Sequence, residues 1–141
     1  MANVGTDKIR SVAVVAHSGA GKTSLIDAML YAAGENTRLG KVSEGTSLCD
    51  YNSDEIERKI TINSKALHLT WNGACIYLLD TPGYADFIGE VLAALKACDS
   101  ALVLVDAVSG VEVGTERVWE LLNKHNLPRM ILINKMDKEN A

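Results

Sequence analysis

The segment AHSGAGKTS, residues 16–24, constrains the fold more than any other part of the 141-residue sequence. It joins SVAVV at 11–15, a run typical of a buried strand, to a helical pattern at 22–33. Its glycines allow backbone N–H groups to face an anion. Lys22 opens the helix, where the helix dipole disfavours a cation, and therefore indicates a bound anion. The segment matches the phosphate-loop pattern GxxxxGK[ST], with alanine in place of the first glycine. The predicted phosphate-binding residues are Ser18, Gly19, Ala20, Gly21, Lys22, Thr23 and Ser24.

The rest of the chain alternates between strand-like and helix-like segments. Alternating residues at 66–71, the turn pair Asn72-Gly73 and the run ACIYLLD at 74–80 predict a β-hairpin. Helical periods cover 87–98 and 113–126, and apolar runs at 101–106 and 129–133 predict two further strands. Residues 35–58 are polar and lack a period, which favours a long functional or mobile loop. This order predicts an α/β fold: a doubly wound, mostly parallel sheet with one antiparallel edge strand.

Composition limits the classes of function. The formal net charge is −4 and the pI is near 5.3, so we expect no basic RNA-binding patch in this chain. Its three cysteines are widely spaced and form no CxxC pair, which favours reduced thiols and a cytoplasmic location. The opening residues MANVGTDKIR contain no apolar stretch of the kind found in signal peptides, and no run is long enough for a membrane helix.

The segment DTPG at 80–83 follows the second strand of the predicted hairpin. Asp80 is therefore expected at the same sheet edge as Lys22, where doubly wound sheets bind ligands. Phosphates would repel a carboxylate unless Mg2+ lay between them, so we interpret Asp80 as a partner of the metal, directly or through water. Gly83 has no side chain, and its N–H is expected to approach the γ-phosphate.

The segment NKMD at 134–137 follows the last predicted strand at the same edge. The carboxylate of Asp137 can accept hydrogen bonds from both N1–H and the N2 amino group of guanine, which adenine does not offer. Asn134 is expected to tie this loop to the phosphate loop, and the stem of Lys135 to cover the base. The three motifs together predict a guanine nucleotide, GTP or GDP, and argue against an ATP-using kinase.

These motifs, with ERKITI at 57–62, DTPGYADF at 80–87 and VLVDAVSGVEVGTERVW at 103–119, resemble the GTPase domain of elongation factor G and its close paralogues. The resemblance covers nearly the whole chain. It implies a P-loop GTPase fold and Mg2+-dependent GTP hydrolysis, slow without the ribosome. It also implies that hydrolysis drives a conformational step on the ribosome.

The resemblance also implies roles for single residues. Lys22 holds the β- and γ-phosphates, Thr23 binds Mg2+, Asp80 is a second-sphere partner of the metal, and Gly83 donates to the γ-phosphate. Thr61 matches the switch threonine that contacts Mg2+ in the GTP state, or else it is simply a β-branched residue entering the next strand. We count Lys22, Thr61, Gly83 and Tyr84 as the predicted catalytic set, and Thr23, Thr61 and Asp80 as the predicted metal set.

The sequence departs from the family pattern at two positions and in its length. Lys59 stands where the family usually has glycine, so we expect the closed geometry of this segment to be perturbed. Tyr84 stands where elongation factors usually carry histidine; it either orients the attacking water or packs over the loop. The family's enzymes are several times longer, so we expect residues 1–141 to be an N-terminal fragment of the GTP-binding domain, truncated just after the guanine motif.

Two alternative functions remain. A ribosomal protection or release-factor GTPase of the same family would share these motifs. A module that binds GDP or GTP with negligible turnover would share them as well.

His17 is interpreted as a packed or solvent-facing loop residue, and the charged run at 54–59 as either a solvated face or a ribosome-facing switch.

Overall fold

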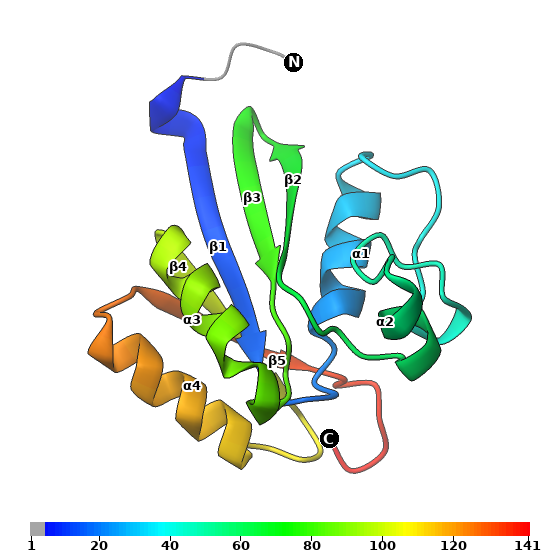
Figure 1. Ribbon diagram of the computed structural model, residues 1–141. Coiled ribbons are helices and arrows are strands. Elements are labelled where there is room, and N and C mark those ends of the chain that lie inside the picture. Colours follow the sequence, from blue (N-terminus) through cyan, green and yellow to red (C-terminus); the bar gives the residue numbers. More distant parts are fainter. Residues whose placement is uncertain (1–4) are drawn as a thin grey trace.

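A computed structural model describes residues 5–141 (Figure 1). The expectation of no signal peptide rests partly on the first four residues, which lie outside the described residues. The strands are β1 (Ile9–Ala16), β2 (Lys65–Trp71), β3 (Ala74–Asp80), β4 (Ser100–Asp106) and β5 (Arg129–Asn134). The helices are α1 (Lys22–Ala32), α2 (Ser53–Arg58), α3 (Ile88–Ala97) and α4 (Val113–Lys124), with short 3-10 turns at Thr6–Lys8, Val42–Glu44 and Ala85–Phe87.

The strands form one sheet in the order β2-β3-β1-β4-β5, and only β2 runs antiparallel to its neighbour. The register pairs Val14 with Asp80 and Ala16 with Leu104, so the carboxyl ends of β1, β3 and β4 meet at one edge. In Figure 1, α1 covers one face of the sheet while α3 and α4 cover the other. The predicted doubly wound sheet with an antiparallel edge strand is confirmed.

The central strand β1 is buried on both faces, as its continuous apolar run indicates. Ala13 and Val15 belong to a core with α3 and α4, whereas Val14 and Ala16 belong to a core with α1. The two cores therefore pack against both faces of β1, and the phosphate loop begins at the carboxyl end of this strand.

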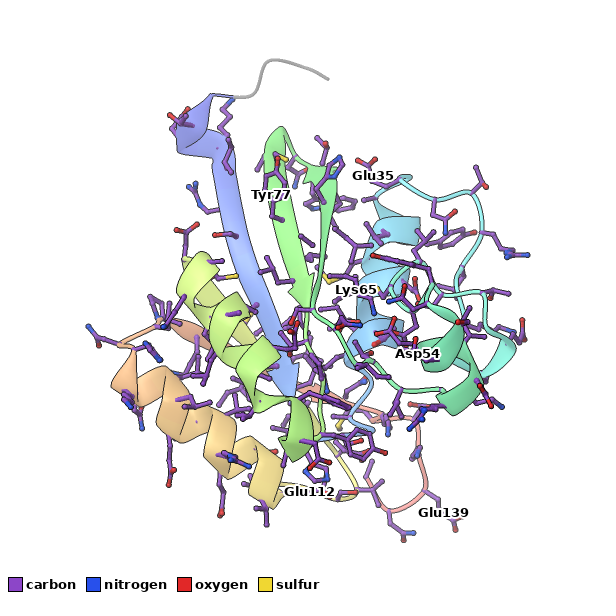
Figure 2. The ribbon with its side chains drawn as sticks, viewed as in Figure 1. Glu35, Asp54, Lys65, Tyr77, Glu112 and Glu139 are labelled. Carbon is purple, nitrogen blue, oxygen red and sulfur yellow. The ribbon has the colours of Figure 1, made fainter. Side chains whose placement is uncertain are left out.

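Local signals set most element ends. Gly34 has a φ of 78°, and the N–H of Glu35 donates to the carbonyl of Leu30 (3.0 Å), so α1 ends one residue before the predicted Ala33. The Glu35 carboxylate then accepts the N–H of Thr70 (3.0 Å) and joins the end of α1 to β2 (Figure 2). The hairpin turn is confirmed, with positive φ at Asn72 and Gly73.

Several other sequence-based expectations differ from the structure. Residues 35–58, predicted as a loop, contain α2, because a six-residue helix is too short to show a sustained apolar period. The first strand begins at Ile9, two residues before the predicted start. Trp71, on the alternating face of β2, is 52% exposed, since the hairpin end extends past the core. None of the helices in the described part of the chain is long and apolar enough to cross a membrane.

Candidate functional site

The phosphate loop links β1 to α1 at the carboxyl edge of the sheet. Gly21 has a φ of 99°, and a Cβ there would lie 2.5 Å from Asn134 Nδ2, so only glycine fits. The side chain of Lys22 is buried, and its Nζ donates to the carbonyls of Ala16 (3.4 Å) and His17 (3.2 Å). Burial lowers the pKa of Lys22 to about 8, although the carboxylates of Asp80 and Asp50 oppose the shift. A buried ammonium at a helix start is a favourable partner for phosphate.

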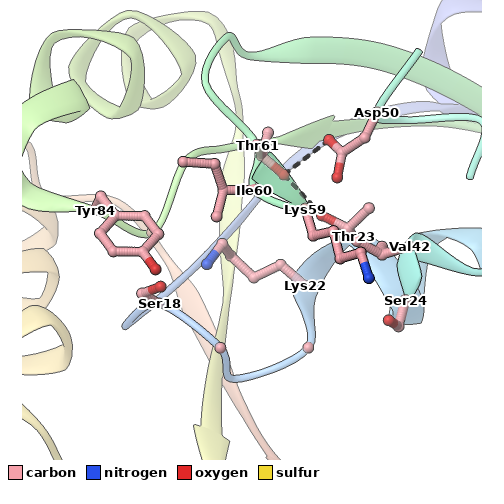
Figure 3. A pocket seen from close by; sticks show the side chains of 13 residues that line it. Ser18, Lys22, Thr23, Ser24, Val42, Asp50, Lys59, Ile60, Thr61 and Tyr84 are labelled. Carbon is pink, nitrogen blue, oxygen red and sulfur yellow. Dashed lines mark hydrogen bonds between the residues drawn. The ribbon is translucent and has the colours of Figure 1, made fainter. Parts of the chain in front are cut away.

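Thr23, Thr61 and Asp80, the predicted metal set, lie together. Thr23 Oγ1 donates to Asp80 Oδ2 (2.8 Å), and Thr61 Oγ1 donates to Asp50 Oδ1 (2.9 Å). The two hydroxyl oxygens are 3.0 Å apart (Figure 3). A hydroxyl has one proton and two lone pairs, so when both protons point to carboxylates the oxygens face each other with lone pairs. A cation coordinated by both oxygens would stabilise this arrangement.

Unsatisfied carboxylate oxygens also indicate a cation. Asp80 Oδ1 and Asp50 Oδ2 are buried and have no hydrogen-bond partner among the described residues. Burial raises the pKa of Asp80 to about 6, even though the Thr23 hydroxyl and Lys22 lower it. The described residues contain no cluster of three His, Cys, Asp or Glu ligands. Mg2+ instead binds hydroxyl and carboxylate oxygens, and phosphate and water oxygens complete its coordination shell. The residues present therefore fit Mg2+.

Gly83 lies against the phosphate loop. A Cβ at Gly83 would lie 2.6 Å from Lys22 Nζ and 2.7 Å from Ser18 Cα, so any side chain would push the two loops apart. The N–H of Gly83 can therefore come close to a ligand held by Lys22. The predicted placement of Gly83 at the phosphate edge agrees with this geometry.

Tyr84 is 44% exposed and stands between two cavities. One cavity, of about 180 Å³, is also lined by Ser18, Lys22 and Ile60, and Figure 3 shows the tyrosine hydroxyl directed toward Ser18 and Lys22. The other, of about 290 Å³, lies between the loop after β3 and α4. Ligand pockets span roughly 300–1,000 Å³, so the first cavity accommodates the phosphate end of a nucleotide rather than all of it.

The NKMD loop follows β5 beside the phosphate loop. Asn134 Nδ2 donates to the carbonyl of Ala20 (2.9 Å), which is the predicted tie between the loops. Lys135 Nζ donates to the carbonyl of Gly19 (2.6 Å) and to Asp106 Oδ2 (2.6 Å), a link that the sequence did not reveal. The hydrogen bond from Lys135 holds the pKa of Asp106 at about 2. Asp137 is exposed in the turn that follows.

Sequence reasoning missed three buried charged residues beside this site: Asp50, Glu55 and Lys65. One signal was available, because Asn52 followed by Glu55 is a helix N-terminus pattern and the helix it opens brings Glu55 inward. His17 is half-buried: its Nδ1 accepts the N–H of Gly114 (3.2 Å) and its Nε2 lies 3.5 Å from Glu112. His17 thus packs the phosphate loop against the start of α4.

Lys59 adopts the backbone conformation that glycine would supply. Its φ of 56° and ψ of 39° are left-handed, it caps α2, and its N–H donates to the carbonyl of Glu55. Lys59 thus keeps the left-handed backbone that glycine would adopt, and the effect of this substitution on the closed geometry of the segment stays a prediction. The left-handed conformation costs a non-glycine residue roughly 1–2 kcal/mol, which the surrounding contacts must offset.

Part of the segment at 35–60 packs against the rest of the domain, so only the remaining part of it is expected to be mobile. Cys49 and Glu55 are fully buried, and Asp27 on α1 accepts the N–H of Leu48 (3.0 Å). We therefore expect amide hydrogen exchange to be fast at 36–46 and slow at 48–63, because amides that donate to buried carboxylates open rarely. Exchange measured by mass spectrometry checks this; uniformly fast exchange across 36–63 would contradict the packing.

The fold and the site define a P-loop nucleotide-binding protein. A model of the family described as "Elongation factor Tu GTP binding domain" matches residues 7–141, and the chain belongs to this family. The translational GTPase resemblance seen in the sequence is thereby confirmed.

Relatives with known names or structures agree. Proteins named "Ribosome-releasing factor 2, mitochondrial" from Candida albicans and Drosophila virilis are 44% and 46% identical over 99% and 96% of this chain. A crystal structure of a protein from Thermus thermophilus is 45% identical, covers 95% of this chain and superposes with a TM-score of 0.92. The chain spans only 17%, 19% and 20%, respectively, of the length of these three proteins.

Proposed function

We propose that this chain is the GTP-binding domain of an elongation-factor-G-like translation factor, which hydrolyses GTP with Mg2+ to drive a conformational step on the ribosome. The observation that supports this most is the convergence of Lys22, Thr23, Asp80, Gly83 and Asn134 at one sheet edge in a chain of this family. Three free thiols, one of them buried, suit a cytoplasmic location, which we propose with it.

The residues at this edge suit distinct tasks. Lys22 would hold the β- and γ-phosphates, and Gly83 would donate its N–H to the γ-phosphate. Thr23 and Thr61 would ligate Mg2+, with Asp80 as its second-sphere partner. When bound, the ion would neutralise charge on the β- and γ-oxygens. Asp137 would read guanine, and Tyr84 would orient the attacking water. Phosphoryl transfer depends on such positioning more than on proton abstraction.

A phosphate-release assay on this chain, with and without ribosomes, tests the proposal. Slow Mg2+-dependent release from GTP that ribosomes accelerate is the expected result. Guanine-nucleotide binding with no release under either condition would instead identify a binding module. The relatives' name favours a second candidate of the same family, a GTPase that releases ribosomes.

The role of Tyr84 can be tested by substitution. Its hydroxyl is expected to orient water less well than an imidazole, because a phenol oxygen is a weaker hydrogen-bond acceptor than an imidazole nitrogen. We expect Tyr84→His to speed single-turnover GTP hydrolysis on ribosomes and Tyr84→Phe to slow it, each by roughly 2- to 10-fold, the value of one ordinary hydrogen bond. If Tyr84→Phe matches the wild type, the ring only packs over the loop.

A further inference from the structure

Lys65 is a buried lysine with no part in the proposed chemistry. Its side chain is only 5% exposed, and it opens β2 directly opposite Asp80 on β3. Its position is therefore fixed by the sheet, next to a residue of the predicted metal set. Figure 2 shows Lys65 on the side of the hairpin that faces α1 and α2. A buried ammonium needs anionic partners, because desolvation of an unpaired charge is costly.

The first partner of Lys65 is Glu55 on α2, whose side chain is fully buried. Glu55 Oε1 forms an ion pair with Lys65 Nζ and also accepts the N–H groups of Ile62 (2.8 Å) and Asn63 (3.1 Å). One carboxylate oxygen thus joins α2, the segment after Thr61 and β2.

The second partner is Asp50, whose side chain is 4% exposed and whose Oδ1 lies 3.8 Å from Lys65 Nζ. The same Asp50 oxygen accepts the hydroxyl of Thr61, which stands 3.0 Å from the hydroxyl of Thr23 (Figure 3). The ring of Tyr51 lies 5.5 Å from Lys65 Nζ and covers the pair. A continuous set of contacts therefore runs from the sheet to the proposed Mg2+ ligands.

We propose that Lys65 is a positioning residue: through Glu55 and Asp50 it holds the Thr61 hydroxyl in place beside Thr23. The inference rests on the proposed function for its Mg2+ role, but all of its contacts join protein atoms. Without the ammonium, two buried carboxylates would face each other unpaired, and the segment carrying Thr61 would move toward water.

The test uses the 141-residue chain and the variant Lys65→Met, which keeps length and removes charge. Amide exchange at residues 50–63 is measured without nucleotide, and a non-hydrolysable GTP analogue is titrated at increasing Mg2+. We expect exchange at Ile62 and Asn63 to accelerate at least about tenfold. We expect the Mg2+ concentration for half-maximal binding to rise roughly 10- to 100-fold, as for other residues that support metal ligands. Lys41→Met, which removes an exposed ion pair with Glu44, is the matched control and should change neither.

The double variant Glu55→Gln/Lys65→Met separates positioning from simple stability. Its neutral amide oxygen can still accept the two N–H groups, so we expect a folded protein with exchange close to wild type. Asp50 still lacks the ammonium of Lys65, so the raised Mg2+ requirement should persist. If Lys65→Met alone does not fold, the Mg2+ dependence of the double variant still decides whether Lys65 is a positioning residue.

Each outcome gives a decision. Wild-type Mg2+ dependence in the double variant, or unchanged exchange in a folded Lys65→Met, overturns the inference while leaving guanine-nucleotide binding intact. If the wild type binds no analogue, the proposed function fails. The exchange measurements then still decide whether Lys65 holds the segment around Thr61.

Discussion

Lys22→Ala should lose most of its affinity for GTP. The ammonium is buried at the start of α1, within reach of Gly83, and a charge-assisted hydrogen bond is worth about 1.5–3 kcal/mol. That range corresponds to a loss of roughly 10- to 150-fold in equilibrium titrations with a fluorescent GTP analogue. Further loss is expected if the loop rearranges, because the carbonyls of Ala16 and His17 also lose their donor.

Two controls make this result interpretable. Circular dichroism should show an intact fold, since the two cores on either side of β1 do not include Lys22. Lys41→Ala removes an exposed lysine from the neighbouring segment and should leave GTP affinity unchanged. Equal GTP affinity in folded Lys22→Ala would refute the phosphate loop.

Asp137→Asn should exchange guanine preference for xanthine preference. The carboxylate accepts two hydrogen bonds from guanine, whereas an amide can donate to the carbonyl that xanthine presents instead. Bidentate base recognition is worth about 1–3 kcal/mol, so we expect GDP to bind roughly 5- to 150-fold more weakly and XDP to bind more tightly. The loop itself should keep its place, because Asn134 and Lys135 hold it to Ala20, Gly19 and Asp106.

Parallel titrations of fluorescent GDP and XDP measure the switch. Glu139→Gln is the matched control, because it neutralises another exposed carboxylate of the same loop and should alter neither affinity. Retained GDP preference in Asp137→Asn would show that this loop does not read the base.

The sheet and the nucleotide loops were predictable because their signals are local. The β-branched run before AHSGAGKTS, the Asn72-Gly73 turn and the motifs at strand ends each determine a short stretch of backbone. Parallel strands then bring their carboxyl ends to one edge, so Lys22, Asp80 and Asn134 had to meet.

Contacts between distant side chains were not predictable in the same way. The ion pairs of Lys65 with Glu55 and Asp50 depend on how α2 folds back over β2, which no periodicity in residues 50–65 reveals. The left-handed backbone of Lys59 is likewise a tertiary result, since its propensity alone argues against it. The Lys135–Asp106 pair joins the loop after β5 to the end of β4, 29 positions away.

An equilibrium titration of this chain with fluorescent GDP and ADP, each in Mg2+ and in EDTA, tests the guanine-nucleotide site most directly. The phosphate loop, DTPG and NKMD at the sheet edge predict saturable GDP binding that weakens when Mg2+ is removed. Adenine lacks the donors that guanine offers to the Asp137 carboxylate, so ADP should bind at least about tenfold more weakly than GDP. Equal binding of ADP and GDP, or no binding of either with Mg2+ present, would contradict the assignment of a guanine-nucleotide site.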